Sequence, residues 1–161
     1  MATVVDTTKV TERRQVHFDS LDDILADVER LAKSPNIKAL GNWSPGQVLS
    51  HLAIALNKSI DGYENRPPAL VRVVARSLFK RRFLTKTMSA GFKLPAKAMD
   101  ELTTPPVPFE EGLQSFRQAI RRLKTETKRA PNPVLGELTP AEWIQFHCRH
   151  AELHLSFLVP A

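Results

Sequence analysis

Three helix-start signals constrain this sequence to a helical fold more strongly than any other feature. Each is a capping box, in which a serine or threonine is followed three residues later by an acidic residue or glutamine: Ser20–Asp23, Ser44–Gln47 and Thr139–Glu142. The hydroxyl accepts a hydrogen bond from an early helical N–H, and the second side chain bonds back to the N-cap backbone. The second and third boxes also place proline at the first helical position, where no N–H is needed. Helices are therefore predicted to begin just after each box.

Apolar residues at helical spacing follow each signal and recur in two further stretches. No stretch alternates apolar and polar residues over a useful strand length, so no strand is expected. Residues 88–108 contain four prolines and few periodic apolar residues, which predicts an ordered connection around the domain. The expected fold class is all-α, a helical bundle. The helices are predicted over residues 21–33, 45–61, 67–83, 109–128 and 140–158.

The length of 161 residues and the hydrophobic content of 42% suit one domain with one core. We expect residues 1–16 to form a polar lead and residues 17–161 to form that domain. The lead has no apolar run typical of a signal peptide, and no segment approaches the ~18 apolar residues of a membrane span, so a cytoplasmic location is expected. Cys148 is the only cysteine, so an internal disulfide is excluded and a buried, apolar role is expected.

Three of the five histidines, His147, His150 and His154, lie within eight residues. At about 100° per residue they fall within roughly 60° of one another on a helix, so their imidazoles share one face. Histidines four residues apart can bind one metal ion, and His51 on a facing helix would complete a three-nitrogen site of the kind that suits zinc, nickel or iron. The spacing leaves a second interpretation open, in which these histidines face the core and bond to backbone carbonyls.

Two segments resemble a known superfamily. Residues 41–52 (GNWSPGQVLSHL) resemble the second-helix motif of the DinB/YfiT-like superfamily of metal-binding four-helix bundles. Residues 132–143 (NPVLGELTPAEW), followed by His150 and His154, resemble its fourth-helix motif. The resemblance implies that residues 17–161 form a four-helix bundle of up-down-down-up topology, with a long connection between the middle helices. It also places the chain in a branch of unknown function.

The same resemblance implies a divalent metal ion held by His51, His150 and His154, with zinc or nickel expected and iron as an alternative. Characterised members include transferases and isomerases that use a low-molecular-weight thiol, which loses its proton when it coordinates a metal. His147, one turn before His150, is interpreted as a second-shell residue that supports the ligands. The alternative is that His147 is a fourth ligand.

Four other side chains near these motifs are expected to lie outside the site. Glu152 lies about 200° around the helix from His150, so it is expected to face solvent. Trp43 and Trp143 are expected to pack in the core, with a role as pocket walls as the alternative. His17 is expected at the surface.

Nine of the 23 lysines and arginines lie between Arg66 and Lys97, a segment without any acidic residue. The net charge of +6 is therefore concentrated in one region. Such a segment invites a nucleic-acid or membrane-surface interpretation, but no recognised nucleic-acid-binding motif accompanies it. A solvated face that attracts anionic small molecules is preferred here, so no membrane partner is expected and nucleic acid is disfavoured.

The sequence thus favours a metal-dependent thiol transferase or hydrolase that acts on a small-molecule substrate. One alternative is a non-catalytic helical bundle that acts as a binding or stress-associated protein. A third is a basic nucleic-acid-binding module. Whether the protein is an enzyme, and which residues would be catalytic, is left open. A homodimer is an expectation from the resemblance alone.

Overall fold

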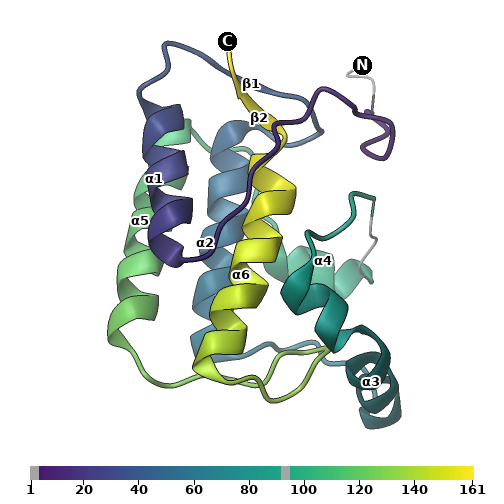
Figure 1. Ribbon diagram of the computed structural model, residues 1–161. Helices are drawn as coiled ribbons and strands as arrows, with labels where there is room; N and C mark the ends of the chain where they lie inside the picture. Colours follow the sequence, from purple (N-terminus) through teal and green to yellow (C-terminus); the bar gives the residue numbers. More distant parts are fainter. Residues whose placement is uncertain (1–3, 92–94) are drawn as a thin grey trace.

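A computed structural model describes residues 4–91 and 95–161 of the chain. These residues form six helices and one small two-stranded sheet, so the prediction of a mainly helical fold is confirmed (Figure 1). The sheet itself was not predicted, because strands of three residues are too short to show an alternating pattern. No helix in the described part of the chain is long and apolar enough to cross a membrane. The elements are α1 (Leu21–Ala32), β1 (Ile37–Ala39), α2 (Pro45–Asp61), α3 (Ala69–Thr85), α4 (Ala96–Leu102), α5 (Phe109–Thr125), α6 (Pro140–Leu155) and β2 (Leu158–Pro160).

The three predicted capping boxes are all formed, at the N-termini of α1, α2 and α6. In α2, the Gln47 N–H donates to Ser44 Oγ over 3.2 Å, and the Ser44 N–H donates back to Gln47 Oε1 over 3.1 Å. These bonds satisfy backbone donors that have no partner within the helix. They fix the register of α2 from its first turn, and so fix which of its side chains face the interior.

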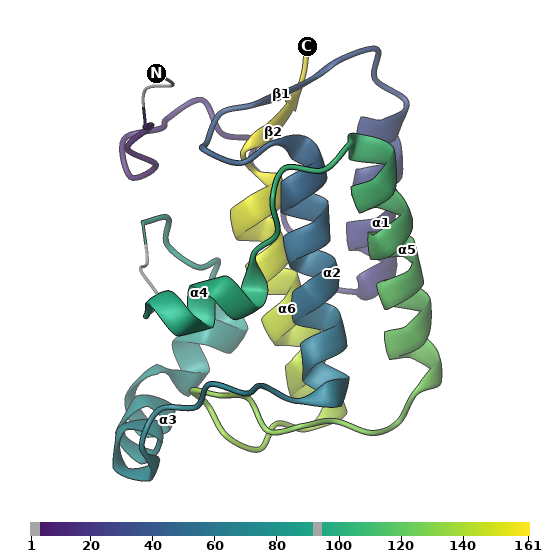
Figure 2. The same ribbon diagram turned by 180° about the vertical axis from the view of Figure 1, so that it is seen from behind.

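Helices α1, α2, α5 and α6 lie side by side and enclose the main apolar core (Figures 1 and 2). Helices α2 and α5 come into direct backbone contact where Gly46 meets Gly112. A Cβ added at Gly112 would lie 2.4 Å from Gly46 O, and one at Gly46 would lie 2.2 Å from Val107 O. Neither position has room for a side chain, so the glycines allow the two helices to pack backbone against backbone.

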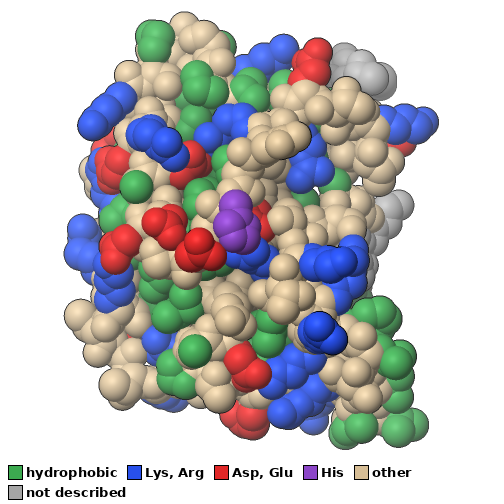
Figure 3. Space-filling model, viewed as in Figure 1, with side chains coloured by type: hydrophobic (Ala, Val, Ile, Leu, Met, Phe, Trp, Pro, Cys, Tyr) green, Lys and Arg blue, Asp and Glu red, His purple; other side chains and the backbone are tan. Residues whose placement is uncertain are grey.

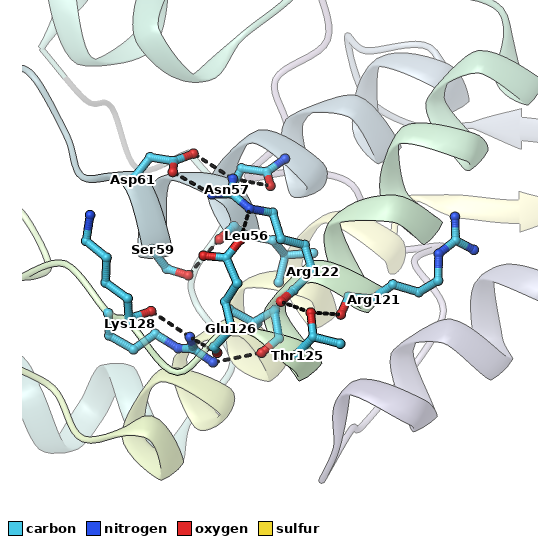
Figure 4. Close-up of polar contacts among 11 residues, drawn as sticks. Leu56, Asn57, Ser59, Asp61, Arg121, Arg122, Thr125, Glu126 and Lys128 are labelled. Carbon is cyan, nitrogen blue, oxygen red and sulfur yellow. Dashed lines mark hydrogen bonds and ion pairs between the residues drawn. The ribbon is translucent and has the colours of Figure 1, made fainter.

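The opposite ends of α2 and α5 are joined by a network of ion pairs around Arg122 (Figure 4). Its guanidinium donates to both carboxylate oxygens of Asp61, at 2.6 and 2.7 Å, and to Asn57 Oδ1 at 3.1 Å. It also donates to Glu126 Oε1, at 2.7 Å. A bidentate arginine–carboxylate pair of this kind fixes the relative orientation of the two side chains and also strengthens their interaction. The network therefore aligns α5 with α2 at the end remote from the glycine contact.

Helices α3 and α4 lie to one side of the other four (Figures 1 and 2). Helix α4 falls in the segment that the sequence analysis interpreted as an ordered connection; the helix itself was not predicted, because its seven residues are too few to give a periodic pattern. Of the 17 residues of α3, all of which the structure describes, only Leu84 is buried. The apolar residues of α3 thus lie mainly on the protein surface.

The two strands lie at one end of the helices and pair antiparallel, with Ala39 opposite Leu158. Strand β2 follows α6, which ends at Leu155 and not near residue 158 as predicted. The described segment before α1, residues 4–20, is called the N-terminal lead from here on. It runs along α6 and is attached there: the Arg14 N–H donates to Ser156 O at 2.9 Å, and the Arg14 guanidinium pairs with Asp27 of α1 at 2.7 Å. The lead therefore covers a side of α6 that the sequence analysis expected to face solvent.

Candidate metal site

His51 lies in the second turn of α2, with its side chain held by the last residue of α4. Only 5% of its surface is exposed, and its Nδ1 lies 2.8 Å from the carbonyl oxygen of Leu102. A carbonyl can only accept a hydrogen bond, so the proton of the neutral ring belongs on Nδ1. This leaves the Nε2 lone pair of His51 directed away from Leu102.

His150 and His154 occupy successive turns of α6 and face His51. The Nε2 atom of His150 lies 3.0 Å from the Nε2 atom of His51 and 3.0 Å from that of His154. All three nitrogens lie within 4.8 Å of one another, and the group includes no carboxylate or thiol from the described residues. The structure therefore brings together the three histidines that the sequence analysis named as candidate ligands.

Hydrogen bonds cannot satisfy both of the 3.0 Å contacts that His150 Nε2 makes. His150 Nε2 carries either a proton or a lone pair, so it can donate to one neighbour or accept from one. The His51 nitrogen that faces it is already a lone pair, because the His51 proton lies toward Leu102. One of the two 3.0 Å contacts of His150 is thus left without a linear hydrogen bond. A cation that accepts all three lone pairs would remove this conflict, and nitrogens bonded to one zinc ion at 2.0–2.1 Å lie about 3 to 3.4 Å apart.

Burial keeps all three imidazoles neutral. It lowers the pKa of His51, although the hydrogen bond to Leu102 acts in the opposite direction. It lowers the pKa values of His150 and His154 well below the usual value, and the neighbouring imidazoles add to this effect. Neutral imidazole is the form that binds a metal, so the ligands need not lose protons near neutral pH.

Trp43 forms one wall of the site. Its indole stacks on His154, with ring centroids 5.4 Å apart and an interplanar angle of 8°, and it also contacts the ring of His51 at 4.8 Å. The prediction that Trp43 packs against the core is confirmed, because its partly buried side chain contacts the main apolar core as well as the two histidines. Trp143 is fully buried, as expected, and stacks on His147.

His147 lies outside the three-nitrogen group, although it shares the helix face. Its Nε2 is buried and has no hydrogen-bond partner in the described part of the chain. Burial, together with the positive charge of Arg129, lowers its pKa to about 3. The Nδ1 of His150 is likewise buried without a partner among the described residues, so no hydrogen bond links His147 to it.

The prediction that Glu152 faces solvent is wrong. The helical angle correctly places it away from the histidine face, but the N-terminal lead covers that side of α6 and leaves Glu152 0% exposed. Its carboxylate accepts from the Phe18 N–H at 3.0 Å, pairs with Arg149 at 2.9 Å and His17 at 3.0 Å, and accepts from the Thr87 hydroxyl. Glu152 therefore anchors the lead to α6. His17 is exposed, as expected.

Sequence reasoning missed the Leu102 carbonyl, which orients His51. A backbone oxygen leaves no residue signature, and the helix that positions it was not predicted. The burial of Cys148, at 1% exposure, is as expected, and burial raises the pKa of its thiol to about 11. The cysteine is thus neither a ligand nor an activated nucleophile in this arrangement.

Comparison with known proteins identifies the family of this chain. Neither the curated proteins nor the solved structures include a significant relative of this chain. A family model covers residues 10–161, which include the later part of the N-terminal lead, all six helices and the histidine group. The chain therefore belongs to the family described as Protein of unknown function (DUF1569).

Proposed function

We propose that the protein binds one divalent metal ion through the Nε2 atoms of His51, His150 and His154. The observation that carries the proposal is the convergence of three neutral imidazoles, with 3.0 Å contacts that protons alone cannot satisfy. Zinc or nickel suits a set of three nitrogen ligands, and iron is an alternative. Three protein ligands leave a coordination position for a substrate or a water molecule.

We further propose that the protein is a DinB-like four-helix bundle of up-down-down-up topology. Support comes from α1, α2, α5 and α6, which lie side by side (Figure 1). The ligands come from α2 and α6, as the resemblance of residues 41–52 and 132–143 implies. Helices α3 and α4 then form the long connection between α2 and α5.

Thiol transfer is the reaction that the site favours, with hydrolysis second. A bound divalent ion would act as a Lewis acid that lowers the pKa of a coordinating thiol, so that the thiol would release its proton to solvent. Activation of water by general-base catalysis needs a nearby carboxylate or similar base, and none of the described residues adds one to the histidine group. The residues of the chain would orient the ligands: Leu102 O holds the ring of His51, and Trp43 covers His154.

The first test is metal content, measured by inductively coupled plasma mass spectrometry on protein purified without an affinity tag. The wild-type protein and the variants His51→Ala and His154→Ala are compared. His147→Leu is the matched control, since His147 is a buried histidine on the same helix but outside the group. We expect near-stoichiometric metal in the wild type and in His147→Leu, and its loss in both ligand variants.

Absence of metal in the wild type, even after incubation with zinc or nickel, would refute the metal site. The histidines would then serve the packing of a non-catalytic bundle. Equal loss of metal in His147→Leu would assign His147 to the coordination sphere as a fourth ligand. If metal is present, the metal-loaded protein is screened with low-molecular-weight thiols and electrophilic substrates, with His154→Ala as the inactive control.

A further inference from the structure

Helix α3 carries most of the exposed large apolar residues of the protein. Six of the eight such residues in the described part of the chain belong to it; the other two, Val4 and Val5, lie in the N-terminal lead. Leu70 is 75% exposed and Leu78 is 67% exposed. Large contiguous apolar patches are rare on protein surfaces that have no binding role. The six residues of this patch are Leu70, Val71, Val73, Val74, Leu78 and Phe79.

Three of the six exposed apolar residues share one side of the helix, and the other three lie on adjoining faces. Leu70, Val74 and Leu78 stand four residues apart and therefore line one face of α3. Arg81 and Arg82, both exposed, continue this side toward the C-terminal end of the helix. Figure 3 shows hydrophobic side chains gathered over α3 where it projects from the other helices, next to a group of lysines and arginines. The exposed surface of α3 thus combines apolar residues with basic residues toward its C-terminal end.

The charge beside the apolar patch is uncompensated. Lys80 is the one basic residue of α3 that forms a salt bridge within the described residues, to Glu142 over 2.6 Å. No carboxylate in the described part of the chain lies within salt-bridge distance of Arg81 or Arg82. The occupant of this surface must therefore accept apolar side chains and supply negative charge at the same place.

An anionic lipid bilayer meets both requirements. Basic residues next to an exposed apolar helix face are the pattern of helices that lie in a membrane interface. A second copy of the chain would bring two unpaired basic clusters together if it used the same face, which electrostatic repulsion opposes. Nucleic acid would satisfy the charges but would leave Leu70, Val74 and Leu78 without an apolar partner.

We propose that α3 is a docking surface for anionic phospholipid bilayers, with Leu70, Val74 and Leu78 among the acyl chains and Arg81 and Arg82 at the phosphates. The proposal replaces the expectation of no membrane partner. The sequence could not show that the apolar side of α3 is exposed, since the same pattern serves a helix that packs on a core. The proposal does not rest on the metal site.

The test is co-sedimentation of the full chain with vesicles of phosphatidylcholine containing phosphatidylserine, and with vesicles of phosphatidylcholine alone. We expect binding to the anionic vesicles that weakens as salt is raised. The triple variant Leu70→Gln, Val74→Gln and Leu78→Gln should weaken binding by roughly tenfold or more, since each side chain loses its burial in the bilayer. The double variant Arg81→Glu and Arg82→Glu should weaken it by about tenfold or more.

Two control variants make the same kinds of substitution at positions outside α3. Val4→Gln with Val5→Gln removes the other exposed apolar residues, and Arg121→Glu with Lys128→Glu makes the same change in net charge on exposed residues outside α3. Both controls should bind vesicles with at least half the wild-type affinity. All substituted positions are exposed, so circular dichroism should show unchanged helix content.

The proposal fails if the wild type does not bind anionic vesicles, if it binds neutral vesicles equally well, or if the controls lose as much binding as the α3 variants. It also fails if sedimentation velocity without vesicles shows a dimer that the Leu70→Gln, Val74→Gln and Leu78→Gln variant dissociates, because the occupant would then be a second copy. Metal content measured on the same preparations reports separately on the proposed function.

Discussion

Replacing Glu152 with glutamine should destabilise the protein without affecting metal binding. The carboxylate is fully buried between α6 and the N-terminal lead, and four groups donate to it or pair with it. Glutamine has nearly the same shape but no charge, so the substitution removes the ion pair with Arg149 and leaves the packing in place. Since Glu152 lies on the side of α6 away from His150, the three-nitrogen group should remain intact.

The size of the effect follows from the contacts that are lost and those that remain. Removing one partner of a buried ion pair costs about 3 to 5 kcal/mol in the free energy of unfolding. Here the cost is smaller, because the glutamine oxygen can still accept from the Phe18 N–H, and Arg149 keeps its hydrogen bond to Phe18 O. We expect a loss of about 2 to 3 kcal/mol, a large part of the typical stability of about 5 to 15 kcal/mol.

The measurement is urea unfolding followed by circular dichroism, with metal content determined on the same samples. Glu111→Gln is the control: Glu111 is exposed on α5 and forms no salt bridge with any described residue, so it should change stability by less than about 0.5 kcal/mol. A loss below about 1 kcal/mol for Glu152→Gln would refute the anchoring role. Loss of metal with the fold retained would instead assign Glu152 to the metal site.

Two further predictions concern α4 and the contact of α2 with α5. Burial raises the pKa of Glu101, but hydrogen bonds from Lys58 and from the backbone of residues 64 and 65 outweigh it and hold the pKa at about 2. Because this pKa lies below the ordinary value of 4.5, the ionised carboxylate of Glu101 stabilises the fold above pH 4.5, and this stabilisation is lost as pH falls toward 2. Glu101→Gln should therefore lower the free energy of unfolding by about 1 kcal/mol at neutral pH. The unfolding curves of the variant and the wild type should converge in acid. Gly112→Ala should destabilise by about 1 to 3 kcal/mol, since its Cβ would lie 2.4 Å from Gly46 O. A thermal shift in the opposite direction, as expected for alanine in an uncrowded helix, would disprove the close contact.

The main helices were predictable because their signals are local. The capping boxes fixed the starts of α1, α2 and α6, and proline at the first helical position strengthened two of them. Helix ends were less well predicted: α5 ends at Thr125 and α6 at Leu155, each three residues early. Where α6 ends depends on β2, which pairs with β1 more than a hundred residues away, and no local pattern encodes such a pairing.

The candidate ligands were predictable for a similar reason, and their surroundings were not. His150 and His154 share a face by helical geometry alone, and the resemblance of residues 41–52 selected His51. Trp43 and Leu102 reach the site through the packing of separate elements, so neither the indole stacked on His154 nor the carbonyl that holds His51 could be read from spacing. Glu152 was misplaced because helical angles give the direction of a side chain but not what covers it.

Two contacts outside the histidine group set its geometry. The first is the Glu152 anchor, which holds α6 against the N-terminal lead. The Glu152→Gln variant keeps the hydrogen bond from the Phe18 N–H and so keeps α6 in place, whereas loss of the whole anchor would let α6 rotate and would move both imidazoles relative to α2. The second is the hydrogen bond from His51 to Leu102 O, which holds the remaining ring from the side of α4. Each contact ties a ligand-bearing helix to an element that carries no ligand. The three nitrogens are therefore held within 4.8 Å of one another before any ion binds, which reduces the binding energy spent on bringing them together.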